Sequence, residues 1–370
     1  MSILTETHDD HGATFVERGG REVVAHYGQP ERAHRAVRNA VGVIERGADV
    51  LVVTGEDRVE YVDNVISNNV PRADGRGTYA LLLTPQGRVR TEMYVYNAGE
   101  RLLVVLPPGT GDPVGTEWSE KTFIQDVDIE VATEQFGLFG VHGPSATEKL
   151  ASVLTTTTPE QHLQFVRGSM VDAGVTVVRT DAPTGEEGYQ VICEATDTAK
   201  VFDTLETRGL NAAPFGYRTW ETLTLEAGTP LFGSELDGGV PNNLGLHAAI
   251  DYEKGCFVGQ EVVARVANRG RPTKRLLGLT TEVVPEPGAA VFDGDESVGE
   301  VTRACRSPTL GRPIAFALLD RDIGERIGEA DALSVRVDGE ERTGTPVSLP
   351  FVEGSDPSDR TPIGDRPSPE

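Results

Sequence analysis

Apolar residues recur at two different spacings in the first third of the chain, and these spacings predict its elements. Helical spacing marks residues 31–47 and 56–70, the second range with Val59, Val62 and Ile66 on one side. Apolar runs rich in β-branched residues, separated by turn signals such as Pro followed by Gly, predict strands. The predicted strands are 49–55, 78–84, 88–97 and 100–108.

The pattern changes twice further along the chain. Residues 125–236 alternate strand-like runs with helical runs, which predicts an α+β arrangement. From Thr273 onwards, short strands alternate with Gly/Pro turns, a pattern typical of a small antiparallel barrel or sandwich. The last stretch, 353–370, is rich in Pro, Ser and Asp, and it predicts a disordered tail.

Charge restricts the surroundings and partners of the protein. The chain has 34 basic and 58 acidic residues, a formal net charge of −24, and only five of the basic residues are lysine. In molar salt the Debye length falls to about 3 Å, so repulsion among the acids is screened. We interpret the composition as halophilic adaptation; the alternative, an acidic patch for a basic partner, requires clustered charge, and the acids are spread along the chain. A nucleic-acid partner is excluded because its backbone requires a basic surface.

The sequence also gives expectations for the compartment. No apolar run reaches the roughly 18 residues of a membrane-spanning helix, and the first residues do not resemble a signal peptide. Cys193, Cys256 and Cys305 have neither disulfide nor metal-ligand spacing. We therefore expect a cytoplasmic protein with no membrane partner and no metal site.

Two polar stretches are candidates for ligand binding. In strand 88–97, alternation places Arg90, Glu92, Tyr94 and Tyr96 on one face. Such a set lines pockets for planar, hydrogen-bonding ligands, with a solvated sheet face as the alternative. In the second stretch, Thr184–Val191, glycines on both sides of two glutamates predict a tight turn that presents a carboxylate, although Gly- and Glu-rich turns are also common without a ligand.

A third stretch contains Cys256. Lys254 precedes it by two residues, and the segment after Gly259 has helical character. A thiol between a cation and a helix N-terminus is expected to be more nucleophilic than usual. The alternative is a half-buried packing cysteine, because the spacing identifies no catalytic base beside it. Cys193, in the apolar strand YQVICEA, and Cys305, in EVTRACRS, are interpreted as structural.

These stretches, in this order, resemble one protein family. Lys254–Glu261, with the sequence KGCFVGQE, looks like the signature of YgfZ-type folate-binding proteins, which are relatives of the glycine cleavage T-protein, an aminomethyltransferase. The T-protein is similar to this chain elsewhere, in RNAVGV, TGEEG, TLEAGTPLFG and VTRACRSPTLGRPIAFALL, so that the resemblance spans about residues 30 to 350.

The resemblance implies an α+β fold with three lobes in a ring around a central folate cavity and a C-terminal antiparallel β-barrel. The implied domains are an N-terminal α+β lobe at 15–124, completed by part of 210–271, a ferredoxin-like α+β lobe with the signature loop at 125–271, the barrel at 272–352 and a disordered acidic tail at 353–370.

The resemblance also implies roles for individual residues. The paired aspartates of the T-protein folate strand fall on Thr91 and Glu92, its tyrosine falls on Tyr96, and its pterin-binding glutamate falls on Glu186. The implied residues for binding tetrahydrofolate or a one-carbon derivative are Glu92, Tyr94, Tyr96, Glu186, Lys254 and Cys256, and those implied for catalysis are Glu92, Lys254 and Cys256.

The chain departs from the transferase pattern at several of these positions. Thr91 removes one acid, and Glu92 is a methylene longer than Asp. A displacement of about an ångström can cost on the order of a hundredfold in rate. Thr224 stands where the transferase normally has Arg, and the transferase motif normally lacks the residue equivalent to Cys256.

Two functions follow from the resemblance. The first is a tetrahydrofolate-binding protein that supports iron–sulfur cluster assembly or repair, with client or assembly proteins as partners. The alternative is an aminomethyltransferase of the glycine cleavage system, which takes its substrate from a lipoylated carrier protein and forms 5,10-methylene-tetrahydrofolate and ammonia, with Glu92 managing the proton. A different folate-dependent methyl transfer or demethylation is a third possibility.

Overall fold

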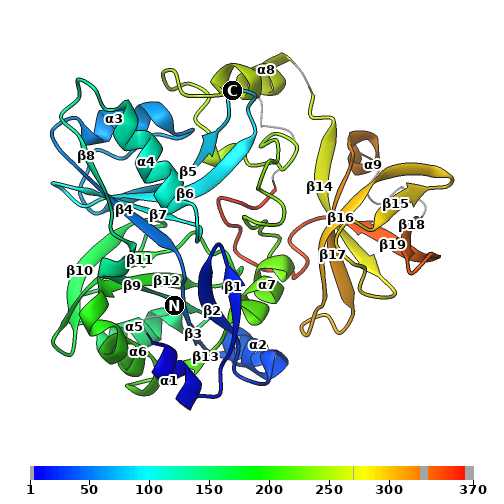
Figure 1. Cartoon of the computed structure of the whole chain (residues 1–370). Coiled ribbons are helices and arrows are strands. Elements are labelled where there is room, and N and C mark those ends of the chain that lie inside the picture. The colour runs from blue at the N-terminus through cyan, green and yellow to red at the C-terminus, as the bar shows by residue number, and fades with distance from the viewer. Residues whose placement is uncertain (1–3, 270, 326–331, 363–370) are drawn as a thin grey trace. The chain divides into compact units, whose positions relative to one another are not determined.

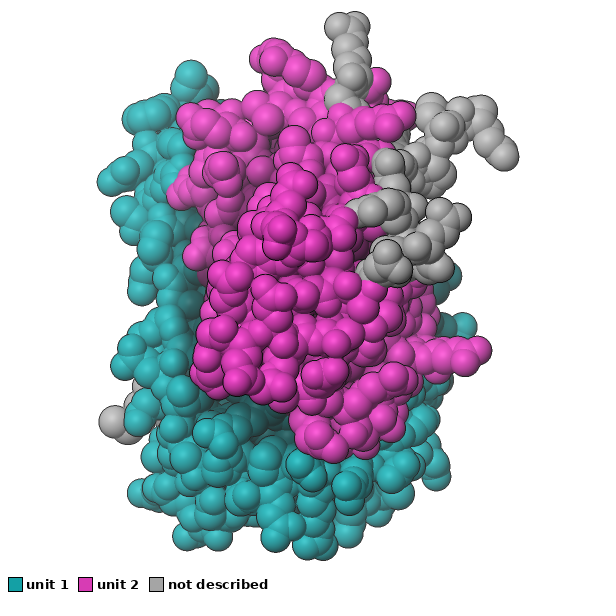
Figure 2. All heavy atoms as spheres, turned by 90° about the vertical axis from the view of Figure 1, so that its right-hand side faces the viewer, with its two compact units in different colours: residues 1–82, 91–182, 186–220 teal, residues 83–90, 183–185, 221–370 magenta. Residues whose placement is uncertain are grey.

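The computed structural model describes residues 4–269, 271–325 and 332–362. The chain divides into two compact units, which Figure 2 colours separately. Unit 1 comprises residues 1–82, 91–182 and 186–220, and unit 2 comprises residues 83–90, 183–185 and 221–370. Within the described ranges, no helix is both long and apolar enough to cross a membrane.

A six-stranded sheet forms one half of unit 1 (Figure 1), in the order β10-β11-β12-β9-β3-β13. The strands are β3 (Gly42–Glu45), β9 (Phe136–His142), β10 (Phe165–Met170), β11 (Ala173–Arg179), β12 (Gly188–Glu194) and β13 (Ala213–Pro214). Helices α5 (Ala146–Val153) and α6 (Thr198–Thr207) bury Leu150 and Phe202 in the same apolar cluster as Phe139 and Val191 of the sheet. This cluster provides the core that supports the central strands β12 and β9 of the sheet.

A second, five-stranded sheet has the order β5-β6-β7-β4-β8. Its strands are β4 (Asp49–Thr54), β5 (Arg76–Leu83), β6 (Val89–Asn97), β7 (Leu102–Leu106) and β8 (Asp128–Val131). Met93 and Val95 of β6 pack with Val62 of α3 (Arg58–Val65) and Trp118 of α4 (Gly111–Lys121) in one buried cluster. Burying one face of β6 in this way leaves its other face for polar contacts, as the alternation predicted.

Unit 1 also contains elements outside its two large sheets. They are helix α1 (Thr5–Asp10), the hairpin β1 (Thr14–Arg18) and β2 (Arg21–His26), helix α2 (Pro30–Asn39) and the first part of helix α7 (Tyr217–Glu226).

The C-terminal part of unit 2 is a closed barrel, labelled at the right of Figure 1, in the order β14-β17-β16-β15-β18-β19. Its strands are β14 (Lys274–Thr281), β15 (Ala290–Asp293), β16 (Glu296–Arg306), β17 (Pro313–Asp320), β18 (Leu333–Val337) and β19 (Glu340–Val347), and helix α9 (Arg321–Glu325) follows β17. All its pairs are antiparallel, and its centre is filled by residues such as Leu279, Val291 and Leu319. Barrel closure leaves no free sheet edge, so the predicted antiparallel barrel is confirmed and the sandwich alternative is wrong.

Two expected elements differ from the structure. The helix expected over 31–47 ends at Asn39, and Gly42–Glu45 forms β3 instead. A Cβ at Gly42 would lie within 2.8 Å of the buried Val37 and Phe215 side chains, so any larger residue would require these side chains to shift. Pairing of β3 with β9 and β13 therefore overrides the helical spacing.

The C-terminal stretch also differs from its prediction. In the expected tail at 353–370, residues up to 362 are placed, whereas 363–370 lie outside the described residues. Ser358, Arg360 and Thr361 are buried, and the Ser358 hydroxyl lies 3.3 Å from that of Thr229. Polar contacts thus order a segment that has no apolar pattern to reveal it. Each sheet also draws one strand from the other side of residue 125, because β3 joins the sheet of β9 to β13, and β8 joins the sheet of β4 to β7.

Candidate functional site

The polar face of β6 is buried rather than solvated. Glu92 is only 8% exposed, and its Oε2 accepts a 2.7 Å hydrogen bond from the hydroxyl of buried Tyr79 on β5. The ring centres of Tyr94 and Tyr79 lie 5.2 Å apart. On its other neighbour, Tyr96, the Tyr94 ring is stacked, with 6.2 Å between the ring centres. The result is a row of three phenol rings beside one oriented carboxylate, and the alternative of a solvated sheet face is wrong.

Two hydrogen bonds within unit 1 join this face to residues on either side of Glu186. Tyr94 donates to Asp181 at 2.8 Å, and Tyr96 donates to Gln190 at 3.0 Å. Asp181 precedes Glu186 by five residues, and Gln190 follows it by four. The segment that carries Glu186 is therefore held to β6 on both of its sides. The structure thus holds residues on both sides of Glu186 to the strand that carries Glu92, Tyr94 and Tyr96, through contacts that no local sequence pattern could specify.

Glu186 itself is half-buried beside a cation. Its Oε1 lies 3.5 Å from Nη1 of Arg38, which comes from α2 and is largely buried. Burial raises the pKa of Glu186 above its ordinary value, and the Arg38 guanidinium opposes part of that rise. The predicted turn is present: Gly185 has φ +77°, a backbone conformation that favours glycine, and β12 begins at Gly188.

The neighbouring Glu187 stabilises the turn. Its Oε2 accepts a 2.5 Å hydrogen bond from the Thr147 hydroxyl of α5, and its Oε1 lies 4.0 Å from Nη2 of Arg179. Arg179 also donates to the Tyr189 hydroxyl at 2.9 Å. The two adjacent glutamates therefore have different partners, Arg38 for Glu186 and the Thr147–Arg179 pair for Glu187.

Lys254 and Cys256 belong to unit 2. Cys256 is exposed, and the Lys254 ammonium lies 5.8 Å from the ring centre of buried Phe257. The Lys254 carbonyl accepts a 3.0 Å hydrogen bond from Gln260, the first residue of helix α8 (Gln260–Arg269). The helix expected after Gly259 is present, and the exposed thiol contradicts the interpretation as a packing cysteine.

The three thiols are expected to differ in reactivity. Burial raises the pKa of both Cys193 and Cys305 to about 12, so almost no thiolate forms at these positions near neutral pH. A maleimide added to the native protein is expected to label Cys256 alone, as measured by peptide mass spectrometry. Cys256→Ala is the control and should remove the labelling. Labelling of Cys193 at a comparable rate would contradict this prediction.

Sequence reasoning missed the residues that support the site. Tyr79, Arg38, Asp181 and Gln190 orient the predicted residues, but each lies in a different part of the sequence from its partner. The polar segment before the turn, RTDAPTG, was the available signal for Asp181. Groups of His, Cys, Asp and Glu that could hold a metal ion are absent from the described ranges.

Comparison with known proteins covers almost the whole chain. Residues 4–254 match the model of the GCVT N-terminal domain, and residues 274–353 match that of the glycine cleavage T-protein C-terminal barrel domain. The chain is 32% identical to an aminomethyltransferase of Saccharopolyspora erythraea, an alignment that covers 94% of this chain and 96% of that relative. It is 31% identical to an aminomethyltransferase of Cutibacterium acnes, with 95% and 98% of the two chains covered.

A solved structure is similar in fold. The crystal structure of the glycine cleavage system aminomethyltransferase T from Bartonella henselae matches with a TM-score of 0.85 over 96% of this chain and 98% of that one. The sequence identity of that match is 20%, so it supports the predicted T-protein fold rather than a specific activity.

Proposed function

We propose, from the premise that this chain belongs to the glycine cleavage T-protein family, that it is an aminomethyltransferase that acts with tetrahydrofolate. The single observation that carries the proposal is the joining of the Glu92 strand to the Glu186 segment by the Tyr94–Asp181 and Tyr96–Gln190 hydrogen bonds. The relatives named aminomethyltransferase, which align over more than nine-tenths of the chain, favour this function over the YgfZ-type function that the cysteine signature suggested.

The residues present suit a folate. Aminomethyltransferases of this family use tetrahydrofolate as the one-carbon acceptor. A pterin ring presents paired N–H donors, for which the carboxylate of Glu186 is a suitable acceptor. The half-buried ring of Tyr94, stacked on the buried ring of Tyr96, offers a flat surface of the kind that ligand pockets use for aromatic groups. Glu186, Tyr94 and Tyr96 would therefore hold the folate, with Glu92 beside them.

Glu92 is the proposed proton-handling group. When bound, tetrahydrofolate supplies the nitrogen atoms that accept the one-carbon unit. The hydrogen bond from Tyr79 fixes the Glu92 carboxylate in one orientation, and burial limits its access to water. A positioned carboxylate of this kind can hold or transfer the proton at the reacting centre. Arg38 has the supporting role of orienting Glu186.

A second candidate function rests on a different observation. Cys256 is exposed within the KGCFVGQE signature, and a thiol is not part of the proton chemistry assigned to Glu92. This favours a YgfZ-type role in iron–sulfur cluster assembly or repair, in which Lys254 and Cys256 act on client proteins. The roles of Lys254 and Cys256 remain predictions under either function.

One assay tests the two functions. The purified protein is mixed with aminomethyl-loaded lipoylated carrier protein and tetrahydrofolate, and the release of ammonia and 5,10-methylene-tetrahydrofolate is measured. Turnover of about 1 per second or faster, within the ordinary range for enzymes, supports the transferase. Tetrahydrofolate binding without turnover would reject it. Loss of iron–sulfur enzyme activities in cells carrying Cys256→Ala would then favour the second function.

The composition adds a condition to this assay. We propose that the chain is cytoplasmic and halophilic. The halophilic interpretation rests on the net charge of −24, which requires screening, and on the low lysine content. The assay is therefore run in molar salt and repeated in dilute buffer, where self-repulsion is expected to reduce activity. Equal activity in both buffers would contradict the halophilic interpretation.

A further inference from the structure

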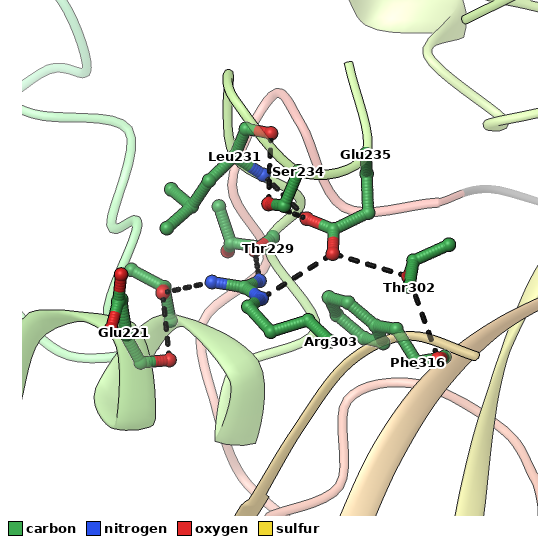
Figure 3. A network of polar contacts seen from close by, with 9 residues as sticks. Glu221, Thr229, Leu231, Ser234, Glu235, Thr302, Arg303 and Phe316 are labelled. Atoms are coloured by element: carbon green, nitrogen blue, oxygen red, sulfur yellow. Dashed lines mark hydrogen bonds and ion pairs between the residues drawn. The ribbon is translucent and has the colours of Figure 1, made fainter. Parts of the chain in front are cut away.

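Arg303 of β16 is the centre of a buried polar network in unit 2 (Figure 3). It is 9% exposed and reaches from the barrel to two other segments. Its Nη1 donates to the Thr224 hydroxyl of α7 at 3.1 Å, and its Nη2 donates to the Thr229 carbonyl at 2.8 Å. The guanidinium carbon lies 5.2 Å from the ring centre of Phe316, so the cation is also covered by an aromatic face.

Glu235 is the anion of the same network, and both of its oxygens have partners (Figure 3). Oε1 lies 3.4 Å from Nε of Arg303 and accepts a 3.2 Å hydrogen bond from Thr302. Oε2 accepts hydrogen bonds of 2.9 Å from the backbone N–H of Leu231 and from the hydroxyl of Ser234. The Arg303–Glu235 pair therefore fixes the turn at residues 229–235 against the barrel strand.

This turn continues directly into the backbone that pairs with the start of β6. Val89 donates to the Gly239 carbonyl at 2.9 Å, and Gly238 donates to the Val89 carbonyl at 2.9 Å. Any side chain at Gly239 would come within 2.9 Å of the Glu235 carbonyl oxygen, so the turn is tightly packed. Val89 is the first residue of β6, and Glu92 follows three residues later on the same strand.

The chemistry of the network indicates positioning rather than general stabilisation. A buried ion pair contributes little net stability compared with apolar side chains of the same volume, because both charges lose their hydration. The ion pair instead restricts the position of the turn, because each hydrogen bond of Arg303 and Glu235 has a preferred length and angle. Apolar packing would also hold the barrel against the turn, but it is not directional and would leave the turn a wider range of positions.

We propose that Arg303 is a positioning residue that, through Glu235 and the turn at 229–239, holds the Val89 end of β6 and so the placement of Glu92. The catalytic consequence rests on the proposed transferase function, whereas the structural coupling does not. The effect of Arg303 on Glu92 is indirect, because it acts through the partners described above.

Amide hydrogen exchange of the whole protein in molar salt tests the coupling. In Arg303→Met, the buried Glu235 carboxylate loses its cation, and we expect the amides of Gly238 and Val89 to exchange at least about tenfold faster. The matched control is Arg336→Met, since Arg336 also lies over a ring, that of Phe292, and pairs with Glu341, but on the exposed barrel surface. Equal exchange at Gly238 and Val89 in the two variants would overturn the proposal.

A second variant separates positioning from loss of the fold. Arg303→Met combined with Glu235→Gln removes both buried charges, so the barrel is expected to regain its protection. The amides at Gly238 and Val89 should remain faster than in the unaltered protein, because the Arg303 hydrogen bonds to Thr224 and Thr229 are still absent. Uniformly faster exchange across the barrel in this double variant would show a merely structural role and reject positioning.

Kinetics then test the catalytic consequence. If Glu92 is displaced, kcat of the double variant falls about tenfold or more while KM for tetrahydrofolate changes little. An unchanged kcat with faster exchange at Val89 would reject the effect on Glu92. Failure of the proposed transferase function would look different, because the unaltered protein itself would then show no turnover. The hydrogen-exchange comparison does not depend on turnover and would still test the structural coupling.

Discussion

Replacing Glu92 with glutamine is expected to lower the kcat for aminomethyl transfer about 100-fold or more. The substitution keeps the size of the side chain and an oxygen that can accept from Tyr79, but it removes the carboxylate that holds the proton. Because the amide retains hydrogen-bonding capacity, the dissociation constant of tetrahydrofolate should change only a few-fold. Steady-state kinetics with the lipoylated carrier, together with folate binding by calorimetry, measure the two quantities separately.

Two further variants test the reason for this loss. Glu92→Asp retains the charge but moves it by about an ångström, so a smaller decrease than for Glu92→Gln is expected. Tyr79→Phe leaves the carboxylate in place and removes only the bond that orients it, so its kcat should also remain above that of Glu92→Gln. Unchanged turnover in Glu92→Gln would remove Glu92 from the mechanism and favour the second candidate function.

The sequence predicted the order of the elements well because most of them follow local patterns. The alternation in β6 correctly placed Met93 and Val95 in the core and Glu92, Tyr94 and Tyr96 on the polar face. The prediction failed at Gly42–Glu45, where pairing with β9 and β13 decides the structure. Local periodicity contains no information about such distant strands.

The same limit applies to the candidate site. Glu92 and Glu186 were identified from the polar face, the turn and the family resemblance, and the turn at Gly185 is present. Arg38 and Asp181 were missed because an ordinary helical arginine and an ordinary loop aspartate acquire roles only when the fold brings Glu186 and Tyr94 to them. Long-range hydrogen bonds of this kind are set by the fold, not by spacing along the chain.

Glu226→Ala is expected to have the largest effect on stability, lowering the free energy of unfolding by about 3 kcal/mol. The Glu226 side chain is fully buried at the end of α7, and its carboxylate accepts from Ser307, from the Thr309 N–H and from the Thr309 hydroxyl. Alanine would leave these donors without an acceptor in a buried site, at a cost of about 1–3 kcal/mol for each group that finds no water. Denaturant unfolding in molar salt measures the change.

The matched control is Glu261→Ala, which removes the same charge from the surface of α8. Glu261 is exposed and pairs with Arg265, one turn further along the helix, so a change within about 0.5 kcal/mol is expected. Subtracting this control removes the general effect of deleting one acid from a chain of net charge −24. Glu226→Gln keeps one oxygen acceptor and should lose less stability than Glu226→Ala. If the alanine variants at 226 and 261 unfold at the same denaturant concentration, the buried carboxylate does not hold the 307–309 loop, and another part of unit 2 must do so.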